Sequence, residues 1–161
     1  MDHLWSPWRM KYMEQDNQKI ECIFCDAVRS NNDEEKLLVY RGKWSFVMLN
    51  RYPYTSGHVM VVPVLHKALF EDLDELTQLE LMQLITQSTQ VIRKVYQPDG
   101  FNIGANIGNG SGAGVVGHLH FHVVPRWSGD SNFMSTISST RVIPEDLSQT
   151  LKKFKKIWSL K

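Results

Sequence analysis

The sequence carries almost no excess charge of either sign. Its 161 residues include 18 Lys and Arg against 17 Asp and Glu, for a formal net charge of +1. This balance gives no electrostatic reason to expect binding to nucleic acid or to a membrane surface. No apolar run approaches membrane-spanning length, and the opening MDHLWSPWRMKYM lacks the continuous hydrophobic segment of a secretory signal. We therefore expect a cytoplasmic protein with no nucleic-acid or membrane partner.

Cysteine is scarce, and the common nucleotide-binding motifs are missing. The two cysteines, Cys22 and Cys25, lie three positions apart. In the cytoplasm such a pair indicates a metal or redox role rather than a structural disulfide. The sequence has no G-x-x-x-x-G-K-[ST] phosphate loop and no G-x-G-x-x-G after its first expected strand. With 42% hydrophobic residues and no internal repeat, the chain is expected to form one domain over residues 1–161.

Hydrophobic patterns predict an α+β fold with an antiparallel sheet, because the strands come in adjacent pairs. Residues 1–20, aromatic and then polar, are expected to form an irregular arm, and ECIFCDAV to start a short helix. The expected strands are KLLVYRG, KWSFVMLN, HVMVVP ending at Pro63, GFNIGANIG and the histidine-containing segment after it.

Two longer helices are also expected. The first runs from Asp72 to Gln97, with Asp72 or Asp74 as its N-cap. The second covers residues 144–159, with an apolar stripe on one side and lysines on the other. The apolar stripe expected for the first helix consists of Leu76, Leu79, Leu84, Val91 and Val95.

Three of the six histidines alternate in GHLHFHVVPRW, residues 117–127. In a strand, His118, His120 and His122 share one face, with Leu119, Phe121 and Val123 behind them in the core. Crowded imidazoles disfavour one another's protonation and each needs partners, which favours a functional site over a structural one. Either the three rings bind one metal ion, or one ring is a nucleophile and the others contact an anionic substrate.

The segment before the histidines is rich in glycine. NIGNGSGAGVVG contains five glycines in twelve residues, so its backbone can approach a ligand closely and present N–H groups to an anion. Because this loop joins the histidine segment directly, we favour phosphate chemistry.

Several segments resemble the histidine-triad (HIT) family of nucleotide hydrolases and transferases. His118-Leu-His120-Phe-His122-Val-Val is similar to the family's H-x-H-x-H-apolar-apolar signature, and MLNRYPYTSGHVMVVP resembles its upstream segment. GAGVVGHLHFHVVPRWSGDSNFM and LWSPWRMKYM look most like the bacterial branch that includes diadenosine tetraphosphate phosphorylases. The resemblance implies a five-stranded antiparallel sheet with two main helices, usually assembled as a homodimer with a continuous ten-stranded sheet.

The resemblance also implies the roles of individual residues. His120 is expected to attack the α-phosphorus and form a nucleotidyl-histidine intermediate, and Asn50 to hold the ribose hydroxyls. Ile23 and Phe24 are expected either to line the purine pocket or to pack in the core. Phosphate contacts are implied for His122, His58 and Asn106.

One departure from the family pattern concerns the leaving group. Many members carry Gln-Ser or Gln-Thr where this chain has Gly114 and Val115. With that side-chain donor missing, backbone N–H groups or another residue must assist the leaving group. This favours phosphorolysis of diadenosine polyphosphates or related purine nucleotides. Hydrolysis of dinucleoside polyphosphates or nucleoside phosphoramidates, and a non-enzymatic nucleotide sensor, remain alternatives.

The cysteine pair alone is compatible with a redox motif, half of a zinc site or two incidental thiols. Zinc-containing relatives place a histidine after a segment like VVPVL, where this chain has His66. The resemblance therefore implies a structural Zn²⁺ on Cys22, Cys25, His66 and His118, which leaves His120 and His122 free for chemistry.

Three further residues have open roles. Arg126 is compatible with contacts to distal phosphates. Trp127 and Phe133 are each compatible with stacking on a second base. Surface packing is an equal alternative for all three.

Overall fold

A five-stranded antiparallel sheet is the framework of the structure. The computed structural model describes residues 22–130 and 145–159, so the expected arm over residues 1–20 lies outside the described residues. The strand order is β1-β2-β3-β5-β4, and every pair is antiparallel. This confirms the predicted α+β fold. The strands are β1 (Leu38–Arg41), β2 (Ser45–Leu49), β3 (Val59–Pro63), β4 (Gly100–Ala105) and β5 (Phe121–Arg126).

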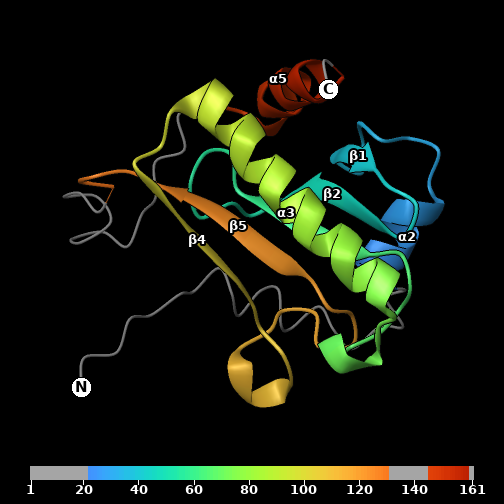
Figure 1. The fold of residues 1–161 in the computed structure, drawn as a ribbon. Coiled ribbons are helices and arrows are strands. Elements are labelled where there is room, and N and C mark those ends of the chain that lie inside the picture. Colours follow the sequence, from blue (N-terminus) through green and yellow to red (C-terminus); the bar gives the residue numbers. More distant parts are fainter. Residues whose placement is uncertain (1–21, 131–144, 160–161) are drawn as a thin grey trace, which may run out of the picture.

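Helices cover both faces of this sheet. The long helix α3 (Glu75–Tyr96) crosses one face, α5 (Leu147–Trp158) packs against α3 and β1, and the short α2 (Ile23–Arg29) lies near the other face (Figure 1). The alternation of strand side chains separates two cores. In β2, Val47 belongs to the core under α3, whereas Phe46 packs with Phe24 of α2. No helix among the described residues is long and apolar enough to cross a membrane.

The buried face of α3 differs in part from the predicted stripe. Leu84 and Val91 are buried as expected, but Leu76 and Leu79 are 55% and 54% exposed. At about 100° per residue, Leu79 points away from the side shared by the buried residues of the helix. The helix starts at the second of the two predicted caps, because the Asp74 side chain accepts from the backbone N–H of Thr77. The buried residues of α3 are Thr77, Leu81, Leu84, Ile85, Ser88, Val91 and Ile92.

The histidine segment enters the sheet later than predicted. β5 begins at Phe121, so only His122 lies within the strand, opposite Met60 of β3 and Gly104 of β4. The preceding residues bond elsewhere: the backbone N–H of Leu119 donates to the carbonyl of Lys67 at 2.7 Å. The expected alternation still holds, because Leu119 and Val123 are buried in the core under α3.

The β1–β2 hairpin is held by a carboxylate of α3. Glu80 Oε1 accepts from the backbone N–H of Lys43 at 2.9 Å, and Oε2 accepts from Trp44 at 2.7 Å. A Cβ at Gly42 would lie 2.7 Å from the Ser45 carbonyl oxygen and 2.8 Å from Glu80 Oε1. Glycine is therefore required where the hairpin meets the helix.

Replacing Glu80 with Ala is expected to lower the free energy of unfolding by about 1–3 kcal/mol, because two backbone N–H groups lose a charged acceptor. Urea unfolding followed by circular dichroism measures the change. Glu71→Ala, at an exposed carboxylate, is the matched control and should shift stability by less than about 0.5 kcal/mol. Equal losses in the two variants would contradict the role assigned to Glu80.

Candidate active site and metal centre

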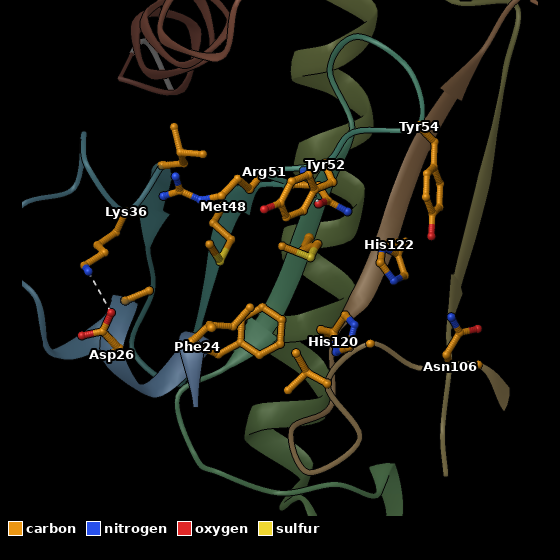
Figure 2. A pocket seen from close by; sticks show the side chains of 18 residues that line it. Phe24, Asp26, Lys36, Met48, Arg51, Tyr52, Tyr54, Asn106, His120 and His122 are labelled. Carbon is orange, nitrogen blue, oxygen red and sulfur yellow. Dashed lines mark hydrogen bonds and ion pairs between the residues drawn. The ribbon is translucent and has the colours of Figure 1, made fainter. Parts of the chain in front are cut away.

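A pocket of about 520 Å³ lies beside the histidines, between α2, the loop after β2 and the glycine-rich loop (Figure 2). One wall is apolar and includes Met48 and Met60, and the histidines form another wall. The pocket brings together most of the predicted site residues from distant parts of the chain. These are Ile23, Phe24, Asn50, Asn106, Gly114, His120 and His122.

A hydrogen bond to the backbone carbonyl two residues earlier sets the orientation of the His120 ring. His120 Nδ1 lies 2.8 Å from the carbonyl oxygen of His118. A carbonyl only accepts, so Nδ1 carries the proton and Nε2 keeps its lone pair. The Phe24 ring packs at 4.8 Å from the His120 ring, and the side chain is 4% exposed. This burial lowers the pKa of His120, so the imidazole is held in the neutral, nucleophilic form.

A chain of hydrogen bonds sets the opposite tautomer in His122. The backbone N–H of Tyr54 donates to His58 Nδ1 at 3.1 Å, which places the His58 proton on Nε2. His58 Nε2 lies 2.9 Å from His122 Nδ1, so His58 donates and His122 accepts. The His122 proton is therefore on Nε2. The pocket thus has an acceptor nitrogen at His120 and a donor nitrogen at His122.

The four predicted metal ligands lie together. Ligand atoms of Cys22, Cys25, His66 and His118 are all within 4.8 Å of one another. Cys22 Sγ is 3.3 Å from His118 Nδ1, and Cys25 Sγ is 3.2 Å from His66 Nδ1. Two cysteine sulfurs and two imidazoles at these separations suit a tetrahedral site.

His118 is prepared for this site by a second contact. Its Nε2 lies 2.9 Å from the carbonyl oxygen of Pro63, so Nε2 carries the proton and Nδ1 keeps its lone pair toward the thiols. Burial lowers the pKa of His118 to about 4, which favours the neutral ring that metal binding requires. The residues present therefore fit a metal ion.

Other predicted residues lie outside the pocket. His58 is 1% exposed and lies behind His122, so the phosphate contact predicted for it stays a prediction. Arg126 lies at the far end of β5, where it donates to Asn102 and Asp130. Trp127 follows it there and does not line the pocket. Phe133 lies outside the described residues.

Several pocket residues were not predicted. Tyr54 stacks on His122 with ring centroids 6.0 Å apart, and it lies with Asn106 on the side of the histidines away from Phe24 (Figure 2). Asp26 and Lys36 form an ion pair on the opposite side. The segment MLNRYPYTSG contains Tyr54 and pointed to this loop, but no sequence pattern distinguished Asp26 or Lys36 from surface charges.

Comparisons with known proteins agree with this geometry. The HIT domain model matches residues 31–129. The chain is 39% identical to a Mycobacterium tuberculosis protein named AP-4-A phosphorylase, over 99% of this chain and 85% of the relative. A zinc-bound histidine triad family protein from Mycobacterium smegmatis superimposes with a TM-score of 0.69 at 25% identity, over 88% of this chain and 98% of that one. A hypothetical histidine triad nucleotide-binding protein from Sulfolobus tokodaii gives 0.68 at 28% identity, over 86% and 93%.

The histidines also give the folded protein a pH-dependent stability. Burial, with a smaller contribution from His120, lowers the pKa of His122 to about 4, whereas an unfolded histidine titrates near 6.5. Above about pH 6.5 both states are neutral and the contribution of His122 is fully present. Between about 6.5 and 4 the unfolded state binds the extra proton, so stability falls as the pH falls.

Replacing His122 with Gln is expected to reduce the loss of unfolding free energy with falling pH. The reduction is at most about 1.4 kcal/mol per pH unit, which is the limit for one titrating group. Urea unfolding from pH 8 to pH 4 measures both profiles. Above pH 7 the two proteins should show the same slope. Parallel profiles below pH 6.5 would mean that His122 is not the titrating group.

Proposed function

The chain belongs to the histidine-triad (HIT) family, and we propose that it is an enzyme that cleaves dinucleoside polyphosphates at the α-phosphorus. Diadenosine polyphosphates or related purine nucleotides are the substrate, and inorganic phosphate is the second substrate. The name of the Mycobacterium tuberculosis relative, AP-4-A phosphorylase, supports this choice. The observation that carries the proposal is the unprotonated Nε2 of His120 in a pocket that also holds the His122 donor.

The first displacement forms a nucleotidyl-histidine. The Nε2 lone pair of His120 attacks the α-phosphorus, and the bond between phosphorus and the bridging oxygen breaks. The remainder of the substrate departs with the electron pair of that bond, as a nucleoside triphosphate when the substrate is a dinucleoside tetraphosphate. His122 Nε2–H donates to the phosphate oxygens as charge develops on them. His58 holds His122 in the tautomer that can donate.

The second displacement removes the nucleotide from His120 and regenerates the free enzyme. An oxygen of inorganic phosphate attacks the same phosphorus, the bond from phosphorus to Nε2 breaks, and a nucleoside diphosphate leaves. The imidazole returns to its neutral form with the proton still on Nδ1. With water in place of phosphate, the product is a nucleoside monophosphate. Phosphorolysis and hydrolysis therefore differ only in the second nucleophile.

Residues around the histidines complete the site. Asn50 precedes the loop that carries Tyr54 and lines the pocket, and it is the residue proposed to hold the ribose hydroxyls. Asn106 is the side-chain donor proposed for the phosphates beyond the α position, in place of the family's Gln-Ser pair. The backbone of Gly114 lines the pocket and supplies a further N–H. Ile23 and Phe24 form part of the wall against which the base packs.

Zinc is the metal that we propose for the cysteine–histidine cluster, because two thiolates and two imidazoles are its preferred tetrahedral set. When bound, it supplies structure rather than a reactive water, since all four positions are taken by the protein. Cys22, Cys25 and His66 would hold it together with the ring of His118. The carbonyl of the same His118 accepts from His120 Nδ1. Order at the metal site therefore favours a fixed orientation of the nucleophile.

The assembly is proposed to be a homodimer joined through the β4 edges into a ten-stranded sheet. β4 is an edge strand of the sheet, and Ile103 on it is 49% exposed. Among the described residues this edge has no partner strand, and β4 carries no charged side chain, which favours pairing with a second copy. We also propose that residues 1–161 act as one domain and that the enzyme works in the cytoplasm.

Replacing His120 with Ala is expected to lower turnover of diadenosine tetraphosphate by roughly 10³-fold or more, because the nucleophile is lost. The variant should still bind adenosine monophosphate, since the pocket walls remain. Rapid acid-free denaturation and mass spectrometry should detect a nucleotidyl adduct in the wild type and none in the variant. Undiminished turnover by His120→Ala would refute the proposed chemistry, and bound nucleotide without turnover in either protein would indicate a sensor.

The second nucleophile is identified in the same assay with ³²P-labelled inorganic phosphate. Phosphorolysis puts the label into the nucleoside diphosphate product. Unlabelled monophosphate as the main product would establish hydrolysis instead.

Replacing both Cys22 and Cys25 with Ser is expected to remove the metal, because two of the four ligands are lost. Mass spectrometric metal analysis should find about one zinc per chain in the wild type and almost none in the variant. We also expect a lower melting temperature and at least tenfold slower turnover. Lys67→Ala, next to His66 but outside the ligand set, is the control and should keep its zinc. A zinc-free variant with full turnover would separate the metal from the orientation of His120.

A further inference from the structure

An ion pair lies at the end of the pocket away from Tyr54 and Asn106. Lys36 Nζ is 2.8 Å from Asp26 Oδ2, and both residues line the pocket (Figure 2). The Asp26 side chain is 48% exposed and that of Lys36 is 24% exposed. An exposed pair of this kind contributes little to stability. Its position on the pocket wall nevertheless gives any ligand there a charged acceptor beside a charged donor.

The helical spacing of α2 orders the side chains along this wall. At about 100° per residue, the four lining residues of α2 follow one another around the helix as Asp26, Ile23, Ala27 and Phe24. Phe24 is at the histidine end, since its ring contacts His120. Asp26 is therefore at the opposite end of the arc, with two apolar residues between them.

This order matches the shape of a purine nucleotide. A purine nucleotide with its α-phosphorus at His120 and its ribose near Asn50 would extend its base along the apolar stretch that also contains Met48, Met60 and Leu37. The edge of the base then reaches Asp26 and Lys36. A third charged side chain near this end, Arg51, also lines the pocket and donates to the backbone carbonyl of Glu35 at 3.2 Å.

The chemistry of the pair selects among bases. A carboxylate only accepts hydrogen bonds and an ammonium group only donates them. The outermost group on this edge of a purine is its 6-substituent. Asp26 lies at the end of the arc of lining residues on α2, so it is the partner assigned to that substituent. An acceptor facing the 6-substituent requires a donor there, which is the amine of adenine; guanine would fit the pair only with its N1–H on Asp26 and its carbonyl oxygen on Lys36.

We propose that Asp26 and Lys36 are specificity-determining residues that recognise a 6-aminopurine. Asp26 accepts from the exocyclic amine, and Lys36 donates to an adjacent ring nitrogen, N1 or N7. The inference rests on the proposed function, because it takes the position of the base from the proposed attack at His120. Neither side chain takes part in the bond changes, so their effect falls on base selection.

The test is a cycle of two ligands and two proteins, with dissociation constants measured by calorimetry. The ligands are adenosine monophosphate and purine riboside monophosphate, which lacks the amine. Wild-type protein should bind the second ligand roughly fivefold to tenfold more weakly, the size expected for one hydrogen bond to a charged group. In Asp26→Ala this ratio should fall to about 1, because the amine no longer has its acceptor.

Matched variants and ligands sharpen the result. Glu34→Ala removes a nearby exposed carboxylate that does not line the pocket, and it should keep the wild-type ratio. Lys36→Met should lose discrimination against 1-deaza- or 7-deaza-adenosine monophosphate. An unchanged amine ratio in Asp26→Ala would overturn the proposal. Tighter wild-type binding of guanosine monophosphate than of adenosine monophosphate would also overturn it.

These measurements separate the inference from the proposed function. Binding of the monophosphates requires no turnover, so the cycle gives its answer in His120→Ala as well as in the wild type. A wild-type protein that forms the nucleotidyl adduct but shows an unchanged ratio in Asp26→Ala would refute the base recognition alone. A lost ratio without any adduct would refute the enzyme proposal alone.

Discussion

The hydrogen bond between His120 Nδ1 and the carbonyl oxygen of His118 is the constraint on which the site depends. It fixes the tautomer of His120 and leaves Nε2 as a lone pair toward the pocket. A backbone carbonyl two residues away can accept in this way only while the segment before β5 keeps its conformation. That conformation is held on one side by Leu119, whose N–H bonds to Lys67, and on the other by the His118 ring.

His118 therefore serves two sites with different atoms. Its ring is directed by the Pro63 carbonyl toward the two cysteines, while its own carbonyl holds His120. Pro63 also ends β3, so the strand end and the cysteine–histidine cluster meet at one residue. Only Leu119 separates His118 of the cluster from His120. The two groups are therefore linked through backbone rather than through a long side-chain network.

The pocket holds hydrogen-bond donors and acceptors close together. Burial keeps His120 and His122 neutral, and the surrounding carbonyl and N–H groups decide which nitrogen of each ring carries the proton. At the other end, Asp26 and Lys36 form an ion pair at a partly exposed position. The proposed attack on phosphate relies on the neutral histidine end of the pocket, and the proposed base recognition relies on the charged end.

The sequence by itself determined the strand pairs, the helices and the residue types of the site, because periodicity and short motifs are local properties. It indicated that Leu119 and Val123 belong to the core. The family resemblance predicted that Cys22, Cys25, His66 and His118 lie together, which the structure confirms. Only the tertiary structure decided the rest. Which nitrogen of His122 carries the proton depends on His58, 64 positions away. The outward direction of Leu76 and Leu79 depends on where α3 meets the sheet. The position of Asp26 and Lys36 in the pocket depends on how α2 packs. Such contacts join residues that are far apart in the sequence, and no local pattern around one residue indicates the other. They are therefore set by packing.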